Sequence, residues 1–112
     1  MITLKSIEPS KRKDKKYLAT FEVDGKIKKT NFGASGMSDF TINKDKERRN
    51  RYIARHTQDL KTNDPTRAGY LSLAILWSKP TIKQSVAFYK ELLKDYNKDK
   101  NIVNFKNKLL NP

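Results

Sequence analysis

The chain has 112 residues, which is enough for one domain with a single modest core but not for two. Its 25 Lys and Arg against 12 Asp and Glu give a net charge of +13, which favours a polyanionic partner because so much like charge repels itself in a small protein. The absence of cysteine excludes disulfides and thiolate metal sites, and a single histidine argues against a zinc site, so we expect no metal or other cofactor.

Residues 2–33 are predicted to form a three-stranded antiparallel meander. Ile2 and Leu4 have strand-like spacing, and the alternation of side chains over residues 17–23 indicates a half-buried strand. Asp24-Gly25 suits the positive φ values of a tight hairpin turn. The register of the returning strand stays open, because a two-residue turn and a bulged turn place Ile27 on opposite faces.

Two helices are predicted next. Asp45 is placed to cap a helix over residues 45–57, in which Tyr52 and Ile53 are the only clear core positions. Asp64-Pro65 supplies a capping carboxylate and a first-turn proline for a helix over residues 65–77. That helix is apolar nearly all round, so we expect it in the interior. Trp77, at the end of this helix, is predicted to be a core residue. The alternative is that its ring stacks on an unpaired base.

The last part of the chain predicts one long helix and a tail. Thr81 and Gln84 have the spacing of a capping box for a helix over residues 81–96. Residues 97–101 make a polar break, and residues up to 112 continue either as a short C-terminal helix or as a tail that docks on a neighbour. All these elements predict a single α+β domain over residues 1–112, with three to four helices packed on the meander.

The clearest functional signal is basic. Within the 45–57 helix, Arg48, Arg51 and Arg55 lie three and four residues apart on one stripe, and guanidinium groups bind phosphate in a bidentate manner. The run Lys11–Lys16 between the first two strands is either a solvated loop or a loop that contacts phosphate. The predicted nucleic-acid-binding residues are Arg48, Arg49, Arg51, Arg55, His56, Lys11, Arg12, Lys13, Lys15 and Lys16.

The segment 33–36, Gly-Ala-Ser-Gly, invites comparison with phosphate-binding loops. It lacks the Gly-Lys-Ser/Thr of the Walker pattern and the spacing of a dinucleotide-binding loop. We interpret it as a strand exit where glycine relieves backbone crowding. Its backbone amides still offer a contact for one nucleic-acid phosphate.

Four acids, Asp39, Asp45, Glu47 and Asp59, raise the hypothesis of a metal-dependent nuclease. Such enzymes need carboxylates that converge on each metal, whereas these acids alternate with Lys and Arg along the chain. We interpret them as helix caps and salt-bridge partners. His56 is predicted to be partly buried beside a carboxylate or a phosphate, and no nucleophile is tied to it by sequence. No catalytic residue is therefore predicted.

A longer pattern resembles a known family. It comprises Phe32-Gly33-Ala34, Gly36, Ser38-Asp39-Phe40-Thr41, Lys44-Asp45, Arg48, Tyr52 and Arg55-His56, and it continues with Asp64-Pro65, Ala68-Gly69, Leu76-Trp77 and Lys79-Pro80-Thr81. Over residues 17 to 90 the chain is similar to small basic proteins encoded by large nucleocytoplasmic DNA viruses of the phycodnavirus and mimivirus kind. Phe40 replaces a typical tyrosine, and residues 57–59 replace a more basic stretch. The resemblance implies a viral source and a role in a virion or viral factory, and it carries no catalytic assignment.

These observations lead to one main functional hypothesis. We expect a non-enzymatic viral protein that binds nucleic acid, with DNA favoured, through phosphate contacts during genome packaging or organisation. The alternative is a minor capsid or core protein that contacts other virion proteins, and a nuclease ranks third. No apolar run is long enough to span a membrane, and the first ten residues lack the core of a signal peptide. We therefore expect an intracellular protein with no membrane partner and no small-molecule substrate.

Overall fold

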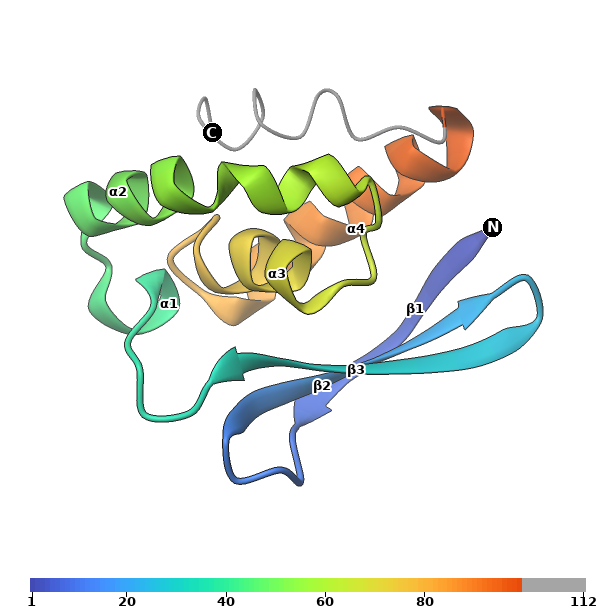
Figure 1. Cartoon of the computed structure of the whole chain (residues 1–112), viewed down its shortest axis with the longest axis horizontal. Helices are drawn as coiled ribbons and strands as arrows, with labels where there is room; N and C mark the ends of the chain where they lie inside the picture. Colours follow the sequence, from blue (N-terminus) through green and yellow to red (C-terminus); the bar gives the residue numbers. More distant parts are fainter. Residues whose placement is uncertain (100–112) are drawn as a thin grey trace.

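The computed structural model describes residues 1–99, in which helices cover one face of an antiparallel sheet (Figure 1). The strands lie in the order β1-β2-β3, so each pairs with its neighbour in sequence. The predicted α+β class, a meander followed by helices packed against it, is confirmed. The strands are β1 (Ile2–Pro9), β2 (Lys15–Val23) and β3 (Lys26–Ala34). The helices are α1 (Phe40–Asn43), α2 (Lys46–His56), η1 (Thr57–Thr62), α3 (Ala68–Leu71), η2 (Ser72–Leu76) and α4 (Ile82–Asp99).

The β2–β3 hairpin settles the register that the sequence left open. Asp24 and Gly25 form a two-residue turn with φ values of 51° and 84°, and Val23 pairs directly with Lys26 across it. This register places Ile27 opposite Glu22, where Ile27 is 59% exposed. Phe21, one position away in β2, is fully buried, so the apolar side of the alternation faces the helices.

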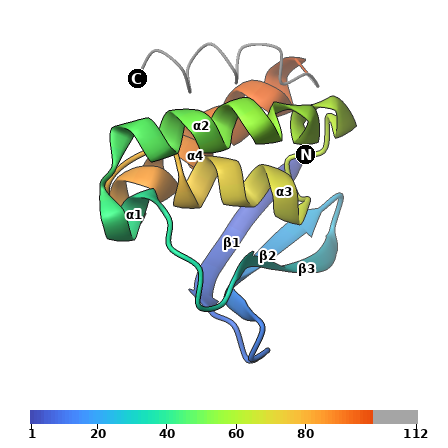
Figure 2. The ribbon, with the colours of Figure 1, turned by 60° about the vertical axis from the view of Figure 1, so that its left-hand side comes forward.

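The predicted interior helix is present but begins later than expected. α3 and its π-helical continuation η2 lie between the sheet and α2 (Figures 1 and 2), and residues 70–77 are all buried except Ser72. Asp64 does not cap this helix: its carboxylate accepts hydrogen bonds from the Thr66 amide at 2.9 Å and the Thr66 hydroxyl at 2.7 Å. Asp64-Pro65 therefore forms a turn, and the helix begins only at Ala68.

α4 begins as predicted and ends later. The Thr81 hydroxyl accepts a hydrogen bond from the Gln84 amide at 3.1 Å, which confirms the N-terminal cap. Of the polar break expected over residues 97–101, residues 97–99 are helical and belong to α4, and residues 100 and 101 lie outside the described residues. The side-chain amide of Asn97 instead exchanges two 2.8 Å hydrogen bonds with the backbone of Ile2 and fastens α4 to β1. The predicted C-terminal helix or tail lies outside the described residues.

Within residues 1–99, no helix combines the length and the apolar character needed to cross a membrane.

Candidate nucleic-acid interface

α2 begins as the sequence predicts and presents arginines on two different sides. The Asp45 carboxylate accepts a hydrogen bond from the Arg48 amide at 3.1 Å, which caps the first turn. Arg48, Arg51 and Arg55 are exposed, as expected of the stripe. Arg49 and Ile53 are buried against the rest of the protein, so one arginine of this helix belongs to the core.

Arg49, predicted among the nucleic-acid-binding residues, is only 5% exposed and is committed to contacts within the protein. Its Nε donates a hydrogen bond to the Ser78 carbonyl at 3.1 Å. Its guanidinium carbon lies 5.6 Å from the centre of the Phe40 ring, within the range of a cation–π contact. Burial lowers the pKa of Arg49 from its ordinary value. Arg49 thus fastens α2 to the segment before α4, and most of its side chain is held in contacts within the protein.

A cavity of about 240 Å³ lies where α2 faces the end of β3 and the segment that follows it. Four residues of α2 line it, and their spacing of four, three and one places them on one helical face. Arg51 is not among them, so the stripe predicted from the sequence divides between the cavity and the outer surface. The charged and aromatic lining residues are Lys16, Asp39, Arg48, Tyr52, Arg55 and His56.

Lys16 and Asp39 form a nearly buried ion pair in the cavity wall. The Lys16 Nζ lies 2.6 Å from the Asp39 Oδ2, and the two side chains are 14% and 2% exposed. Asp39 also caps α1 by accepting hydrogen bonds from the Thr41 amide at 2.9 Å and from the Thr41 hydroxyl. α1 was not predicted from the sequence, although Asp before Phe-Thr is a recognisable cap. Because Asp39 offsets its charge, Lys16 is less available to an anion than an unpaired lysine of a loop would be.

Gly33 shapes the opposite wall. Its φ is +79°, and a Cβ at this position would lie 2.8 Å from Leu76 Cδ1 and 3.3 Å from Lys16 Cβ. These contacts support the interpretation of a strand exit where glycine relieves crowding. The absence of a Cβ lets β3 approach Leu76 of η2, and both Gly33 and Leu76 line the cavity.

A column of three stacked rings runs from the core to the cavity. Trp77 and Tyr52 have ring centres 4.2 Å apart and planes inclined by 10°, and Tyr52 and His56 have centres 4.1 Å apart and planes inclined by 23°. Trp77 is 5% exposed, which confirms its core position. Burial raises the pKa of Tyr52 to about 12. His56 ends the column with a side chain 42% exposed, and its Nδ1 lies 3.5 Å from the Asp59 carboxylate, as expected of a partly buried histidine beside an acid.

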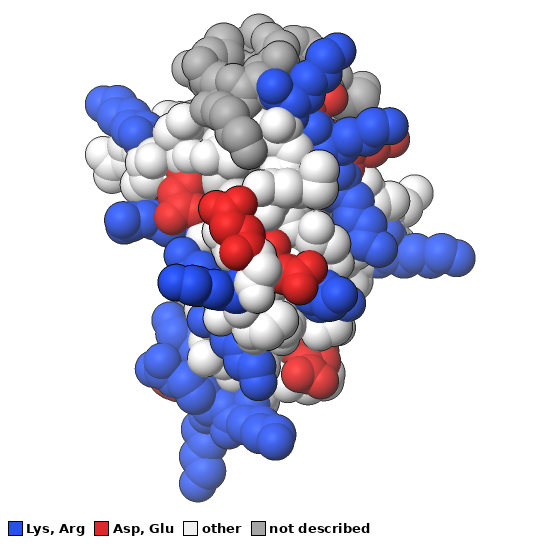
Figure 3. Space-filling model, turned by 90° about the vertical axis from the view of Figure 1, so that its right-hand side faces the viewer, with Lys and Arg blue, Asp and Glu red and all other residues white. Residues whose placement is uncertain are grey.

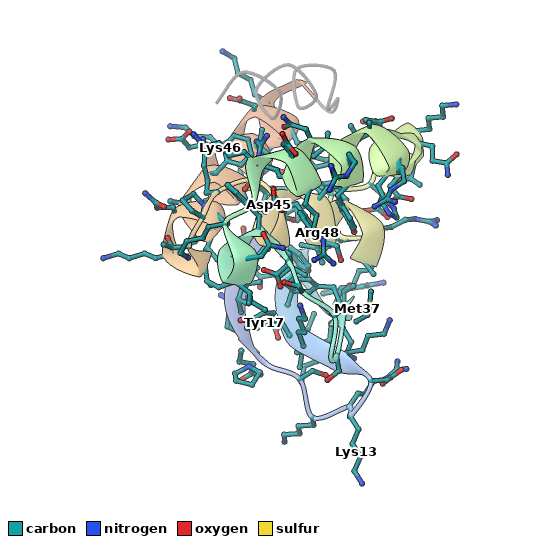
Figure 4. All side chains as sticks on the ribbon, turned by 90° about the vertical axis from the view of Figure 1, so that its left-hand side faces the viewer. Lys13, Tyr17, Met37, Asp45, Lys46 and Arg48 are labelled. Carbon is teal, nitrogen blue, oxygen red and sulfur yellow. The ribbon has the colours of Figure 1, made fainter. Side chains whose placement is uncertain are left out.

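The basic run Lys11–Lys16 is not one loop. Lys15 and Lys16 belong to β2, while Arg12 makes an exposed, two-point ion pair with Asp14 at 3.1 and 2.8 Å. Lys13 lies at the tip of the β1–β2 hairpin and points away from Arg48 (Figure 4). Lys16, at the start of β2 beside the β1–β2 turn, is the residue of this run that lines the cavity with α2.

Charges are unevenly arranged over the surface. Within the described residues, Arg48 and Arg55 have no acidic partner, whereas Arg51 lies 4.0 Å from Glu47. The side opposite to that of Figure 4 carries a group of acidic side chains at its centre, with Lys and Arg around it (Figure 3). Of the four acids considered for a nuclease, Asp39 and Asp45 cap helices, and Asp39, Glu47 and Asp59 each lie beside a basic side chain. Residues 1–99 contain no cluster of three side chains that could hold a metal ion.

No curated protein and no solved structure matches this chain. A family model does match, over residues 5–56, and its description is a family of unknown function, DUF5754. The match includes most of the sheet, α1 and α2, and with them all ten residues predicted to bind nucleic acid. Through residues 5–56, a little under half of its length, the chain is similar to DUF5754, a family of unknown function.

Proposed function

We propose that this protein is a non-enzymatic nucleic-acid-binding protein that contacts phosphates through α2 and the β1–β2 hairpin. The observation that carries the proposal is the position of Arg48 and Arg55. Both are exposed, both line one cavity, and neither has an acidic partner within residues 1–99. Unpaired guanidinium groups on one face are suited to bidentate phosphate contacts.

We propose fewer phosphate contacts than the ten residues predicted from the sequence. Arg49 is buried, and Lys16 is paired with Asp39. The Arg51–Glu47 pair is exposed and long at 4.0 Å, so Arg51 can exchange its acid for a phosphate at little cost. With the hairpin contributing one or two side chains, about four or five phosphate contacts give a log–log slope of affinity against salt of about −4.

Double-stranded or single-stranded DNA of a large virus is the nucleic acid we propose. This choice is supported by the resemblance of residues 17 to 90 to proteins of large nucleocytoplasmic DNA viruses. The net charge of +13 supports a role in neutralising a packed genome or organising it in a viral factory. No base-reading side chain is proposed, so binding is expected to be independent of sequence.

The test measures the affinity for labelled DNA at several salt concentrations. It compares the wild-type protein with the double variant Arg48→Ala, Arg55→Ala. We expect the double variant to bind every sequence about tenfold or more weakly and to have a less steep salt dependence. The matched control is Lys83→Ala with Lys90→Ala, which removes the same charge from exposed positions of α4. Equal losses in the two double variants would show that only net charge matters, and affinity that does not change with salt would overturn the proposal.

A further inference from the structure

We infer that the cavity between β3 and α2 binds the terminal phosphate of a nucleic-acid strand. This inference rests on the proposed function and adds a specific ligand group to it. It follows from the size of the cavity, the charge that faces it and the aromatic column at its edge.

The cavity is large enough for the end of a nucleic-acid strand and for little more. Its volume of about 240 Å³ lies below the range of about 300–1,000 Å³ typical of sites for drug-sized ligands. At about 30 Å³ per water, the cavity holds about eight waters, enough for a phosphate group and part of its sugar. An internal phosphate carries a nucleotide on both sides and cannot enter such a space as deeply as a phosphate at the end of a strand.

The charge facing the cavity suits a phosphate monoester. A terminal phosphate carries a charge of about −1.5 to −2 at pH 7, whereas an internal diester carries one negative charge. Arg48 and Arg55 are the two cavity cations with no acidic partner within residues 1–99. They lie seven residues apart, about 10 Å along the helix axis, so their flexible side chains can approach one group from its two sides. The charge of Lys16 is offset by Asp39, which leaves a net excess of about two positive charges.

The walls add neutral hydrogen-bond donors. Ser38 and Ser72 line the cavity from opposite segments of the chain. The Ser38 Oγ accepts a hydrogen bond from Asn43 Nδ2 at 3.2 Å, so its own hydroxyl hydrogen is directed elsewhere and can serve an anion. A phosphate monoester has three acceptor oxygens, and two arginines with a serine supply a donor for each.

The aromatic column provides a place for the nucleotide that carries the phosphate. Tyr52 is covered by Trp77 on one face and by His56 on the other, so neither face of Tyr52 is open to a base. His56 ends the column and is 42% exposed. A terminal base stacked on the imidazole would extend the column by one ring, while its phosphate lies between Arg48 and Arg55.

The test compares one single strand of about 12 nucleotides, labelled at an internal base, in three forms: with a 5′-phosphate, with a 3′-phosphate, and with hydroxyl groups at both ends. Affinity is measured by fluorescence anisotropy at fixed ionic strength. We expect one phosphorylated form to bind about tenfold more tightly than the hydroxyl form, the effect of one added charge-assisted contact. Arg48→Gln with Arg55→Gln should bring this ratio close to one.

Arg51→Gln is the matched control, because Arg51 lies on the same helix and outside the cavity lining. It should weaken binding of all three forms equally and leave the ratio unchanged. Equal affinity for the three forms, or a ratio that persists in the double variant, would overturn the inference while leaving the proposed function in place. No binding of any form would overturn both. A nucleoside monophosphate that binds as tightly as the phosphorylated strand would also overturn it, by assigning the cavity to free nucleotides.

Discussion

Replacing Arg49 separates an arginine that supports the fold from the arginines proposed to bind phosphate. Arg49 donates a hydrogen bond to the Ser78 carbonyl at 3.1 Å and lies against the Phe40 ring, with 5% of its surface exposed. A hydrogen bond from a charged group contributes about 1.5–3 kcal/mol, and the ring contact adds about 0.5–2 kcal/mol. Since the variant no longer has to desolvate a guanidinium, part of this sum is recovered. We expect Arg49→Ala to lower the free energy of unfolding by about 2–4 kcal/mol.

Urea unfolding followed by circular dichroism measures this loss directly. A domain of this size has a free energy of unfolding of about 5–15 kcal/mol, so Arg49→Ala should remain folded and its DNA affinity can be measured in the same preparation. That affinity should fall by no more than the loss of any one surface charge, because only 5% of Arg49 is exposed.

Arg51→Ala is the control for the loss of charge, since Arg51 is 63% exposed and makes one long ion pair with Glu47. It should change the free energy of unfolding by about 0.5 kcal/mol or less. The reasoning fails if Arg49→Ala costs no more than Arg51→Ala, or if it weakens DNA binding more than Arg48→Ala does.

Three further changes test other parts of the fold. Gly33→Ala should destabilise the protein by about 1–3 kcal/mol in thermal or urea unfolding, because φ is +79° and the added Cβ would crowd the core. Asp64→Asn should make stability fall less steeply in acid. Burial raises the pKa of the Asp64 carboxyl, but the hydrogen bonds from Thr66 and the charges of Lys28 and Arg67 outweigh burial and hold that pKa below its ordinary value. The folded protein therefore gains stability from ionised Asp64 above about pH 4 and loses it as the pH falls through the lowered pKa. Asn97→Ala should speed hydrogen exchange in β1, because it removes both hydrogen bonds to Ile2.

For each of these three predictions, one result would contradict the reasoning. Gly36→Ala is the control for the first, since Gly36 also has positive φ, at +83°, but nothing lies within 4 Å of its Cβ position. Equal losses at Gly33 and Gly36 would mean that crowding contributes nothing. For Asp64, parallel stability curves of wild type and variant between about pH 5 and 3 would refute the assignment. For Asn97, unchanged exchange in β1 would show that its two hydrogen bonds do not secure the strand.

Features set by neighbouring residues could be predicted from the sequence. Asp24-Gly25 has the backbone preferences of a two-residue turn, and the Asp45 carboxylate needs only the amide three residues ahead. Local signals also misled where two local structures compete. Asp64-Pro65 has the pattern of a helix start, but Thr66 supplies both an amide and a hydroxyl to the Asp64 carboxylate, so a turn forms there instead.

Features set by distant residues could not be predicted in this way. Asn97 lies in a stretch that is polar enough to indicate a break, and it stays helical while its side chain binds Ile2, 95 residues earlier. Helical spacing puts Arg49 four residues before the core residue Ile53, but the partners of its guanidinium, Phe40 and the Ser78 carbonyl, lie in other segments and could not be predicted. The cavity combines segments from both halves of the chain, so the spacing of residues 48–56 indicated a basic stripe on α2 but none of the other walls. That stripe also included Arg51, which does not line the cavity.

The aromatic column gives this protein its own optical probe. Trp77 is the single tryptophan of the chain, it lines the cavity, and it is stacked on Tyr52 at 4.2 Å. Fluorescence excited at the red edge of the tryptophan absorption band therefore comes from one indole in one defined environment. A ligand that enters the cavity or displaces His56 changes that environment through the stacked rings. Occupancy of the cavity can thus be followed in unlabelled protein, separately from the phosphate contacts that we propose for the β1–β2 hairpin.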